Sequence, residues 1–203
     1  MNKKDTNTEQ LILQAARKVF IAKGLAGARM QDIADQAGVN KALLHYYFTS
    51  KNKLFDIIFE QEVGSLFGNL VAIIASDLQL FEKIEKIVAL DIERLTQFPG
   101  LPIFILNEMS RNPEVILKRL KKIDVGNLMA GFQKQINSEI KKGTIKKITA
   151  EQLFINIQAL SIFPFIARPM IRGLLQLDEK AYFAMIEKRK TEVAQFIISA
   201  IKV

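Results

Sequence analysis

The chain has 203 residues, 49% of them hydrophobic and 25% charged, which is enough to bury the core of one large domain or of a small domain beside a larger one. It contains no cysteine and one histidine, which excludes disulfide bonds, thiolate metal sites, a cysteine nucleophile and a multi-histidine metal site. The 29 basic residues outnumber the 21 acidic ones, and the resulting net charge of +8 favours a polyanionic partner.

The excess of positive charge is densest in the first quarter of the chain. Residues 1–51 hold eight of the 29 basic residues but only four of the 21 acidic ones. This makes the first quarter the candidate region for binding nucleic acid. The polar start, MNKKDTNTEQ, lacks the pattern of a signal peptide, and the most apolar stretch, 154–167, is interrupted by polar residues and by Pro164. We therefore expect a cytoplasmic protein without a membrane span.

Apolar residues recur with a helical period along almost the whole chain, and no segment alternates with period two. We therefore expect an all-α protein of about nine helices. The predicted helices cover residues 8–23, 29–37, 40–48, 50–75, 78–97, 101–111, 114–142, 149–172 and 179–201. We expect a three-helix DNA-binding domain at residues 1–50 and a larger helical domain, for effector binding and dimerisation, at residues 51–203.

The first predicted helix carries one apolar stripe. Its members are Ile12, Ala15, Ala16, Val19 and Phe20. Thr8 is expected to cap the N-terminus of this helix, with Thr6 and Glu9 as the alternative capping pair. Gly24 is expected to end the helix in a left-handed conformation.

The segment 29–48, RMQDIADQAGVNKALLHYYF, predicts two short helices joined by a tight turn. Gly38 allows a positive φ at the turn, Val39 fills the space between the helices, and Asn40 caps the second helix. The inward-facing residues are Ile33, Ala37, Leu44 and Phe48. This arrangement is typical of a helix-turn-helix, whose second helix enters the major groove of DNA.

The exposed side of the second helix, together with the start of the next one, supplies the candidate contacts with double-stranded DNA. The predicted contact residues are Lys41, Ala42, Leu43, His45, Tyr46, Tyr47 and Lys51. Lysine donates to guanine or phosphate, alanine and leucine contact a thymine methyl group, and histidine and tyrosine form hydrogen bonds with bases or backbone. Taken singly, each could be an ordinary surface residue. The segment as a unit indicates DNA binding.

With these residues in place, the chain resembles the TetR family of bacterial transcriptional regulators. The matching residues are Thr8, Ile12, Ala15, Ala16, Phe20, Gly24, Ile33, Ala34, Ala37, Gly38, Val39, Leu44, Tyr47, Phe48, Ser50, Lys51 and Leu54. The motif covers the first quarter of the chain, and the remainder matches only in length and helix pattern. The resemblance implies a dimeric protein of nine helices, usually a repressor, with an effector pocket in the larger domain.

Two departures from the family pattern bear on DNA binding. Ala28 and Arg29 stand where the family often has threonine, so a hydroxyl cap is lost and Arg29 is expected to replace its phosphate contact as a cation. His45 stands where the family often has tyrosine. Because histidine titrates near neutrality, DNA affinity is expected to rise at lower pH. With Leu43 and His45 altered, no operator sequence carries over from relatives.

Polar residues set into apolar stripes indicate where a largely apolar effector would bind in the larger domain. The candidate pocket residues are Phe104, Asn107, Glu108, Asn127, Met129, Phe132, Phe154 and Gln158. For each polar residue taken singly, a hydrogen bond within the protein or exposure to solvent is the alternative explanation.

The resemblance also implies that the last two helices pair with their copies in a second subunit. The residues predicted at this interface are Leu153, Ile157, Leu160, Pro164, Phe183, Ile186, Val193, Phe196 and Ile197. The alternative is that these stripes pack within one subunit. A two-fold dimer would place its recognition helices roughly 34–36 Å apart, facing a near-palindromic site.

Two other classes of protein are weighed against a ligand-responsive repressor. An all-helical enzyme is disfavoured because the sequence shows no nucleophile–base pair, metal cluster or phosphate loop, and nothing in the spacing of Glu93, Glu108 and Asp124 singles them out. A non-specific nucleic-acid-binding protein would show little preference among sequences. We expect a regulator that is not an enzyme and needs no cofactor or metal, with DNA, a second copy and a small molecule as partners.

Overall fold

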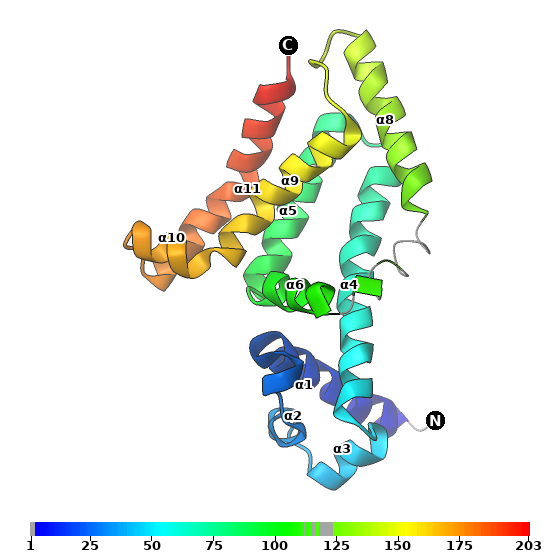
Figure 1. Cartoon of the computed structure of the whole chain (residues 1–203), viewed down its shortest axis with the longest axis vertical. Helices are drawn as coiled ribbons and strands as arrows, with labels where there is room; N and C mark the ends of the chain where they lie inside the picture. Colours follow the sequence, from blue (N-terminus) through cyan, green and yellow to red (C-terminus); the bar gives the residue numbers. More distant parts are fainter. Residues whose placement is uncertain (1–2, 112, 115–116, 118–123) are drawn as a thin grey trace. The chain divides into compact units, whose positions relative to one another are not determined.

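The computed structural model describes residues 3–111, 113–114, 117 and 124–203, and within them the chain forms ten helices and no strand. The helices are α1 (Lys3–Gly27), α2 (Met30–Ala37), α3 (Lys41–Tyr47), α4 (Lys51–Ala75), α5 (Leu80–Gln97), α6 (Leu101–Arg111), α8 (Val125–Lys141), α9 (Ala150–Ile166), α10 (Arg168–Leu174) and α11 (Glu179–Ile201). Figure 1 shows them in chain order. The all-α prediction is confirmed.

The helices fall into two units, and α4 contributes to both. Unit 1 comprises Met1–Leu66 with Ile103–Arg111, and unit 2 comprises Phe67–Pro102 with Asn112–Val203. The predicted DNA-binding domain, residues 1–50, lies wholly inside unit 1. The unit also takes in the first part of α4 and most of α6, whose aromatic side chains pack in its core.

An aromatic cluster joins α1, α4 and α6 inside unit 1. The ring of Phe20 lies edge-on to that of Phe55, with centroids 5.1 Å apart. The ring of Phe104 contacts Phe55 and Phe59 at centroid distances of 5.4 and 5.7 Å. Such tilted pairs stabilise a core beyond the area that they bury. The predicted stripe of α1 is the face that packs here, since all five of its residues are buried.

The first helix begins earlier than the sequence suggested. α1 starts at Lys3, so Thr8 lies inside the helix and the prediction that it caps the N-terminus is wrong. The preceding residues contain no proline or glycine, so nothing in the backbone stops the helix from extending. Gly24 was expected to end the helix in a left-handed conformation. Its φ is positive, at 65°, but its ψ of 178° is extended, so α1 kinks at Gly24 and continues to Gly27.

A charged pair fastens α1 to α4 inside unit 1. The Nε atom of Arg17 lies 2.6 Å from Oε1 of Glu62, whose side chain is only 2% exposed. A carboxylate taken out of water needs a cation or hydrogen-bond donors to offset the loss of hydration. The pair therefore specifies which face of α4 packs against α1.

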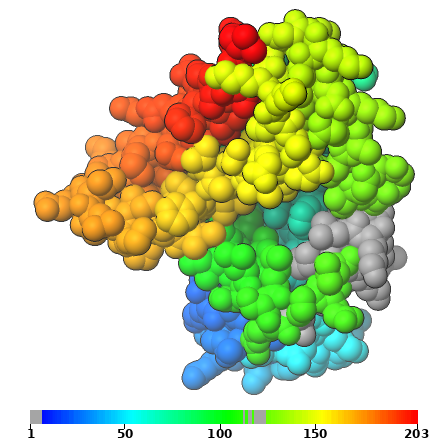
Figure 2. Space-filling view, turned by 45° about the horizontal axis from the view of Figure 1, so that its top comes forward, coloured from blue at the N-terminus to red at the C-terminus, as the bar shows by residue number. Residues whose placement is uncertain are grey.

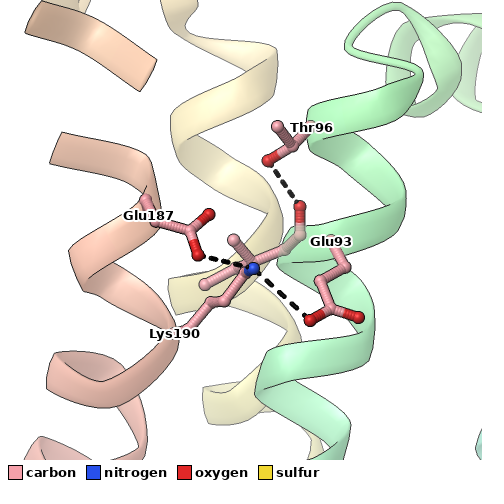
Figure 3. Close-up of polar contacts among 5 residues, drawn as sticks. Glu93, Thr96, Glu187 and Lys190 are labelled. Carbon is pink, nitrogen blue, oxygen red and sulfur yellow. Dashed lines mark hydrogen bonds and ion pairs between the residues drawn. The ribbon is translucent and has the colours of Figure 1, made fainter. Parts of the chain in front are cut away.

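In unit 2, α5 packs against α9 and α11 (Figure 1). The apolar side chains that α5 buries are Leu80, Ile84, Ile87, Val88, Ile92 and Leu95. At the rim, Nζ of Lys190 on α11 lies 3.4 Å from Glu93 on α5 and 2.7 Å from Glu187 (Figure 3). In the same view Thr96 donates to the carbonyl of Ile92 at 2.7 Å. Exposed ion pairs contribute little, so the apolar face holds α5 to α11.

The helix predicted at 149–172 is two helices. α9 ends at Ile166 and α10 begins at Arg168, with a bend of 73° between them. Pro169, in the first turn of α10, lacks the N–H that a continuous helix would use, and its ring would clash with the carbonyl one turn back. Pro164 lies inside α9 and leaves the carbonyl of Leu160 without a helical donor. Arg189 of α11 donates to that carbonyl at 2.8 Å.

The helix predicted at 114–142 is described as α8 from Val125 onward, and most of its first turns lie outside the described residues. Asp124 caps α8 by accepting from the backbone N–H and the side-chain amide of Asn127.

Among the described helices, α4 alone is long and apolar enough to cross a membrane by composition. Its buried residues Leu54, Phe55 and Ile58 belong to the core of unit 1, and 33% of its apolar window is buried.

Candidate DNA-binding surface

The turn between α2 and α3 is built by Gly38, which adopts the left-handed conformation with φ 67° and ψ 28°. Its N–H donates to the carbonyl of Asp35 at 3.2 Å, and the N–H of Val39 donates to that of Ala34 at 3.0 Å. These bonds satisfy the last carbonyls of α2 and turn the chain toward α3. The positive φ predicted at Gly38 is confirmed, and any residue with a Cβ would be strained there.

Asn40 starts α3 as predicted. Its Oδ1 accepts from the backbone N–H of Leu43 at 2.8 Å, which occupies one of the free donors at the helix start. Leu44 is fully buried and Phe48 nearly so, and both anchor α3 to unit 1. Because these residues hold one face of a two-turn helix inward, the opposite face must point to solvent.

The outward face of α3 carries the residues predicted to contact DNA. Those that the structure places in solvent are Lys41, Ala42, Leu43, His45 and Tyr46. Tyr46 is 79% exposed, which is far more than an aromatic side chain needs for folding. Its ring meets that of half-buried Tyr47 edge-to-face, with centroids 5.3 Å apart. This contact restricts the orientation of Tyr46 before any partner arrives.

At the start of α2, Arg29 occupies the capping position with extended backbone. A guanidinium has no acceptor, so it cannot cap the helix as threonine would. Asp32 compensates in part, because its carboxylate accepts from the backbone N–H of Arg29 at 3.2 Å and from Nζ of Lys23 at 2.8 Å. The hydrogen bond from Lys23 lowers the pKa of Asp32. The guanidinium of Arg29 is exposed beside the N-terminus of α2.

Lys51 has a structural task that the sequence did not reveal. Its Nζ donates to the carbonyls of Leu25 at 2.8 Å and of Ala28 at 3.0 Å. These bonds tie the start of α4 to the segment that leads from α1 into α2. An ammonium group has three donors, so a contact with phosphate is compatible with both bonds. That contact stays a prediction.

The predicted pocket residues are divided between the two units. Phe104 belongs to the aromatic cluster of unit 1, where it is 5% exposed, so its assignment to a pocket is corrected to the core. Asn107 and Glu108 lie on the same helix, in unit 1. The other predicted residues, Asn127, Met129, Phe132, Phe154 and Gln158, lie in unit 2.

Within unit 2, two of the predicted pocket residues share a hollow. Asn127 and Phe132 line a depression of about 450 Å³ beside the end of α4. Gln158 lies elsewhere and donates through Nε2 to buried Asp91 at 2.9 Å, which is the hydrogen bond within the protein that the sequence left open. Lys83, Asp77 and Gln135 also line the depression and were missed, because their stretches show no interruption of an apolar stripe that would mark them.

Most of the residues predicted at the dimer interface are buried within the single chain. Val193 is 4% exposed and lines a hollow beside Phe196. Five others of the nine are buried inside the single chain, which leaves them no surface for a partner: Leu153, Ile157, Pro164, Ile186 and Ile197. They pack within unit 2, and their assignment to a dimer interface is corrected. Leu160 and Phe183 are half-buried, and Phe196 is 66% exposed. A helical stripe shows that a face is apolar but not which neighbour covers it.

Among the described residues, no group of three or more histidine, aspartate or glutamate side chains is placed to hold a metal ion.

The surface of unit 1 offers a capped, outward-facing helix with cationic, apolar and hydrogen-bonding side chains. A helix of this kind after a tight turn defines the helix-turn-helix class of DNA-binding domains.

Comparison with known proteins agrees with that class. A family model described as bacterial regulatory proteins, tetR family, matches residues 12–58. The repressor KstR2 of Rhodococcus jostii is 32% identical over 84 residues, which are 41% of each chain. The regulator RutR of Escherichia coli O157:H7 is 27% identical over 151 residues, 74% of this chain and 70% of the relative. The match to the first of these relatives thus spans less than half of its length.

The fold agrees along the whole chain. The structure of the ketosteroid transcriptional regulator KstR2 of Mycobacterium tuberculosis superposes with a TM-score of 0.67 at 14% identity, covering 100% of this chain and 97% of that one. Residues 12–58 thus belong to the TetR family of bacterial regulatory proteins, and the relatives named above are transcriptional regulators.

Proposed function

We propose that this protein is a sequence-specific DNA-binding repressor that reads a near-palindromic operator as a dimer and is released by a small effector. The observation that carries the proposal is the outward face of α3, held by buried Leu44 and capped by Asn40. The residues on that face combine a cation, two apolar contacts and two hydrogen-bonding rings. This is the mixture of side chains with which a recognition helix reads base edges.

The test is a fluorescence anisotropy titration of the full chain with the DNA upstream of its own gene. A random duplex of equal length serves as the competitor at the same salt concentration. We expect the upstream DNA to bind at least ~10³-fold more tightly than the random duplex. Equal affinity for both duplexes would support a non-specific nucleic-acid-binding protein instead, since phosphate contacts alone do not discriminate between sequences.

Replacing Tyr46 by alanine is expected to weaken operator binding roughly 10-fold, because a contact with a base edge contributes on the order of 1–3 kcal/mol. The fold should be unchanged, since the ring is 79% exposed. Operator affinity is measured by anisotropy and stability by thermal unfolding. Leu11→Ala, at an exposed apolar residue of α1, is the control and should leave operator affinity unchanged. Equal affinity of the Tyr46 variant and the wild type would remove Tyr46 from the DNA-binding surface.

A dimer interface is proposed on the apolar side chains that unit 2 leaves exposed on α9 and α11. Phe163 of α9 is 53% exposed and Phe196 of α11 is 66% exposed. Figure 2 shows α9 in yellow beside α11 in orange and red. A hollow of about 300 Å³ lies between them, lined by Leu160, Arg189, Glu192, Val193 and Phe196. Exposed aromatic groups beside an apolar hollow suit a second copy of the same surface.

Replacing Phe196 by glutamate is expected to convert the dimer to a monomer, because a two-fold interface would bury two of the introduced carboxylates. Size-exclusion chromatography with light scattering measures the mass. Lys188→Glu adds a carboxylate to an exposed position of the same helix and should leave the dimer intact. If the Phe196 variant keeps the wild-type mass at micromolar concentration, the interface lies on another face.

A further inference from the structure

Unit 2 contains a hollow beside the last turn of α4, between the start of α5 and one face of α8. Its volume is about 450 Å³, which lies in the range of small-molecule sites. The lining residues are Ile74, Ala75, Ser76, Asp77, Lys83, Asn127, Leu128, Gly131, Phe132 and Gln135. The apolar part of this lining is continuous with the core, since Ile74 and Phe132 are buried.

Gln135 brings an unused hydrogen-bond acceptor to this hollow. Its Nε2 donates to the carbonyl of Leu78 at 2.8 Å. That bond settles the orientation of the amide, because the flipped amide would set two oxygens against each other. Its Oε1 is buried and accepts no hydrogen bond from the residues that the structure describes. An acceptor removed from water without a donor costs free energy, so a donor supplied by a ligand would be favourable there.

The charged groups of the hollow argue against an acidic ligand. Lys83 is buried, and its Nζ donates to the carbonyl of Ile74 at 2.7 Å, close to the C-terminal end of α4. Burial lowers the pKa of Lys83, and the nearby carboxylate of Asp77 opposes that effect. The ammonium group is thus already matched by Asp77 and by the negative end of the α4 dipole. A carboxylate of a ligand would meet those negative groups, and the described lining residues include no second cation.

Gly131 leaves one side of the hollow open. A Cβ built on it meets no atom within 4 Å, and its φ is not in the left-handed region. A larger side chain can therefore be placed there without backbone strain. Gly126, earlier on α8, has the same freedom but does not line the hollow. The two glycines form a matched pair for blocking the site.

We propose that this hollow is the effector site of the regulator and takes a small neutral molecule with an apolar body and one hydrogen-bond donor, which Oε1 of Gln135 accepts. The inference rests on the proposed function. The site belongs to unit 2 alone, and the end of α4 forms one of its walls.

Three probes with the same phenyl body test the chemistry: 2-phenylethanol, its methyl ether and phenylacetate. Isothermal titration on the full chain measures each dissociation constant. We expect 2-phenylethanol to bind roughly 10-fold more tightly than the ether, which lacks the donor, and phenylacetate to bind most weakly. Equal binding of all three probes, or preference for phenylacetate, would overturn the proposed ligand class.

Three variants test whether the probes bind in this hollow. Gly131→Leu is expected to abolish binding of 2-phenylethanol, whereas Gly126→Leu should leave it unchanged. Gln135→Met keeps the length of the side chain but removes the acceptor, so the preference for the alcohol over the ether should disappear. If Gly131→Leu fails to fold, the Gln135 variant still decides the matter. An unchanged preference in Gln135→Met would contradict the inference.

Binding to DNA is measured separately, so the two proposals can fail independently. Wild type and Gly131→Leu should both bind the upstream DNA, and 2-phenylethanol should weaken DNA binding only in the wild type. Loss of sequence-specific DNA binding in the wild type would overturn the proposed function and leave the titration result intact. If the wild type binds the upstream DNA specifically, but 2-phenylethanol does not weaken that binding more than it does in Gly131→Leu, the effector site alone is overturned.

Discussion

Replacing Phe104 by alanine is expected to lower the free energy of unfolding by about 3–5 kcal/mol. The ring is 5% exposed and lies against the rings of Phe55 and Phe59. Removing it leaves a cavity between α4 and α6 that the neighbouring aromatic rings cannot fill without leaving their own contacts. Because the same cluster reaches α1 through Phe20, the loss should reach the part of unit 1 that carries α3.

Urea unfolding followed by circular dichroism measures the effect. Leu106→Ala is the matched control, because Leu106 lies on the same helix and is 44% exposed. The control should change stability by less than about 0.5 kcal/mol. Operator affinity should fall in the Phe104 variant only where the variant is partly unfolded. A loss of less than ~1 kcal/mol would show that the cluster is not a packed core.

Replacing Asp91 by asparagine is expected to remove a pH dependence of stability. Burial raises the pKa of Asp91 from 3.8 to about 7, against the opposing hydrogen bond from Gln158 and the charge of Arg94. The folded chain therefore holds a proton at Asp91 that the unfolded chain releases at a lower pH. The free energy of unfolding should fall as the pH rises from about 4 to about 7. Above about pH 7, Asp91 should cause no further decrease.

The size of this loss is up to ~4 kcal/mol, since each pKa unit corresponds to about 1.4 kcal/mol. Asparagine keeps the shape of the side chain and can still accept from Gln158, so the variant should be more stable than the wild type at pH 8 and similar to it at about pH 4. Urea unfolding at both pH values measures this difference. Glu85→Gln, at an exposed carboxyl of the same helix, should keep the pH profile of the wild type.

The helix-turn-helix was predictable because its signals are local. Gly38 is needed for a positive φ, and Asn40 accepts from an N–H only three residues further along the chain. The burial of Ile33, Leu44 and Phe48 follows from helical spacing alone. The break between α9 and α10 also has a local cause, because Pro169 lies in the first turn of α10. The prediction of one helix at 149–172 did not take this proline into account.

Other assignments depend on partners that lie far away in the sequence. Lys51 is predicted to contact a phosphate, and the structure adds that its ammonium donates to carbonyls 23 and 26 residues earlier. Phe104 was expected in a pocket, but it packs on α4 in unit 1. In each case the residue type indicated the chemistry of the side chain but not which residue the side chain contacts. The same holds for Gln135, whose free acceptor is defined by a bond to a carbonyl 57 residues away.

By itself, the sequence determined the all-α class, the helix-turn-helix and the residues on the outward face of α3. Each of these follows from helical periodicity, a cap or a turn, which act over a few residues. Only the tertiary structure decided which apolar stripes face inward within one chain, that α6 belongs with unit 1, and which polar side chains surround the end of α4. Those outcomes depend on how helices distant in sequence pack, since burial measures what covers a side chain and not what the side chain is.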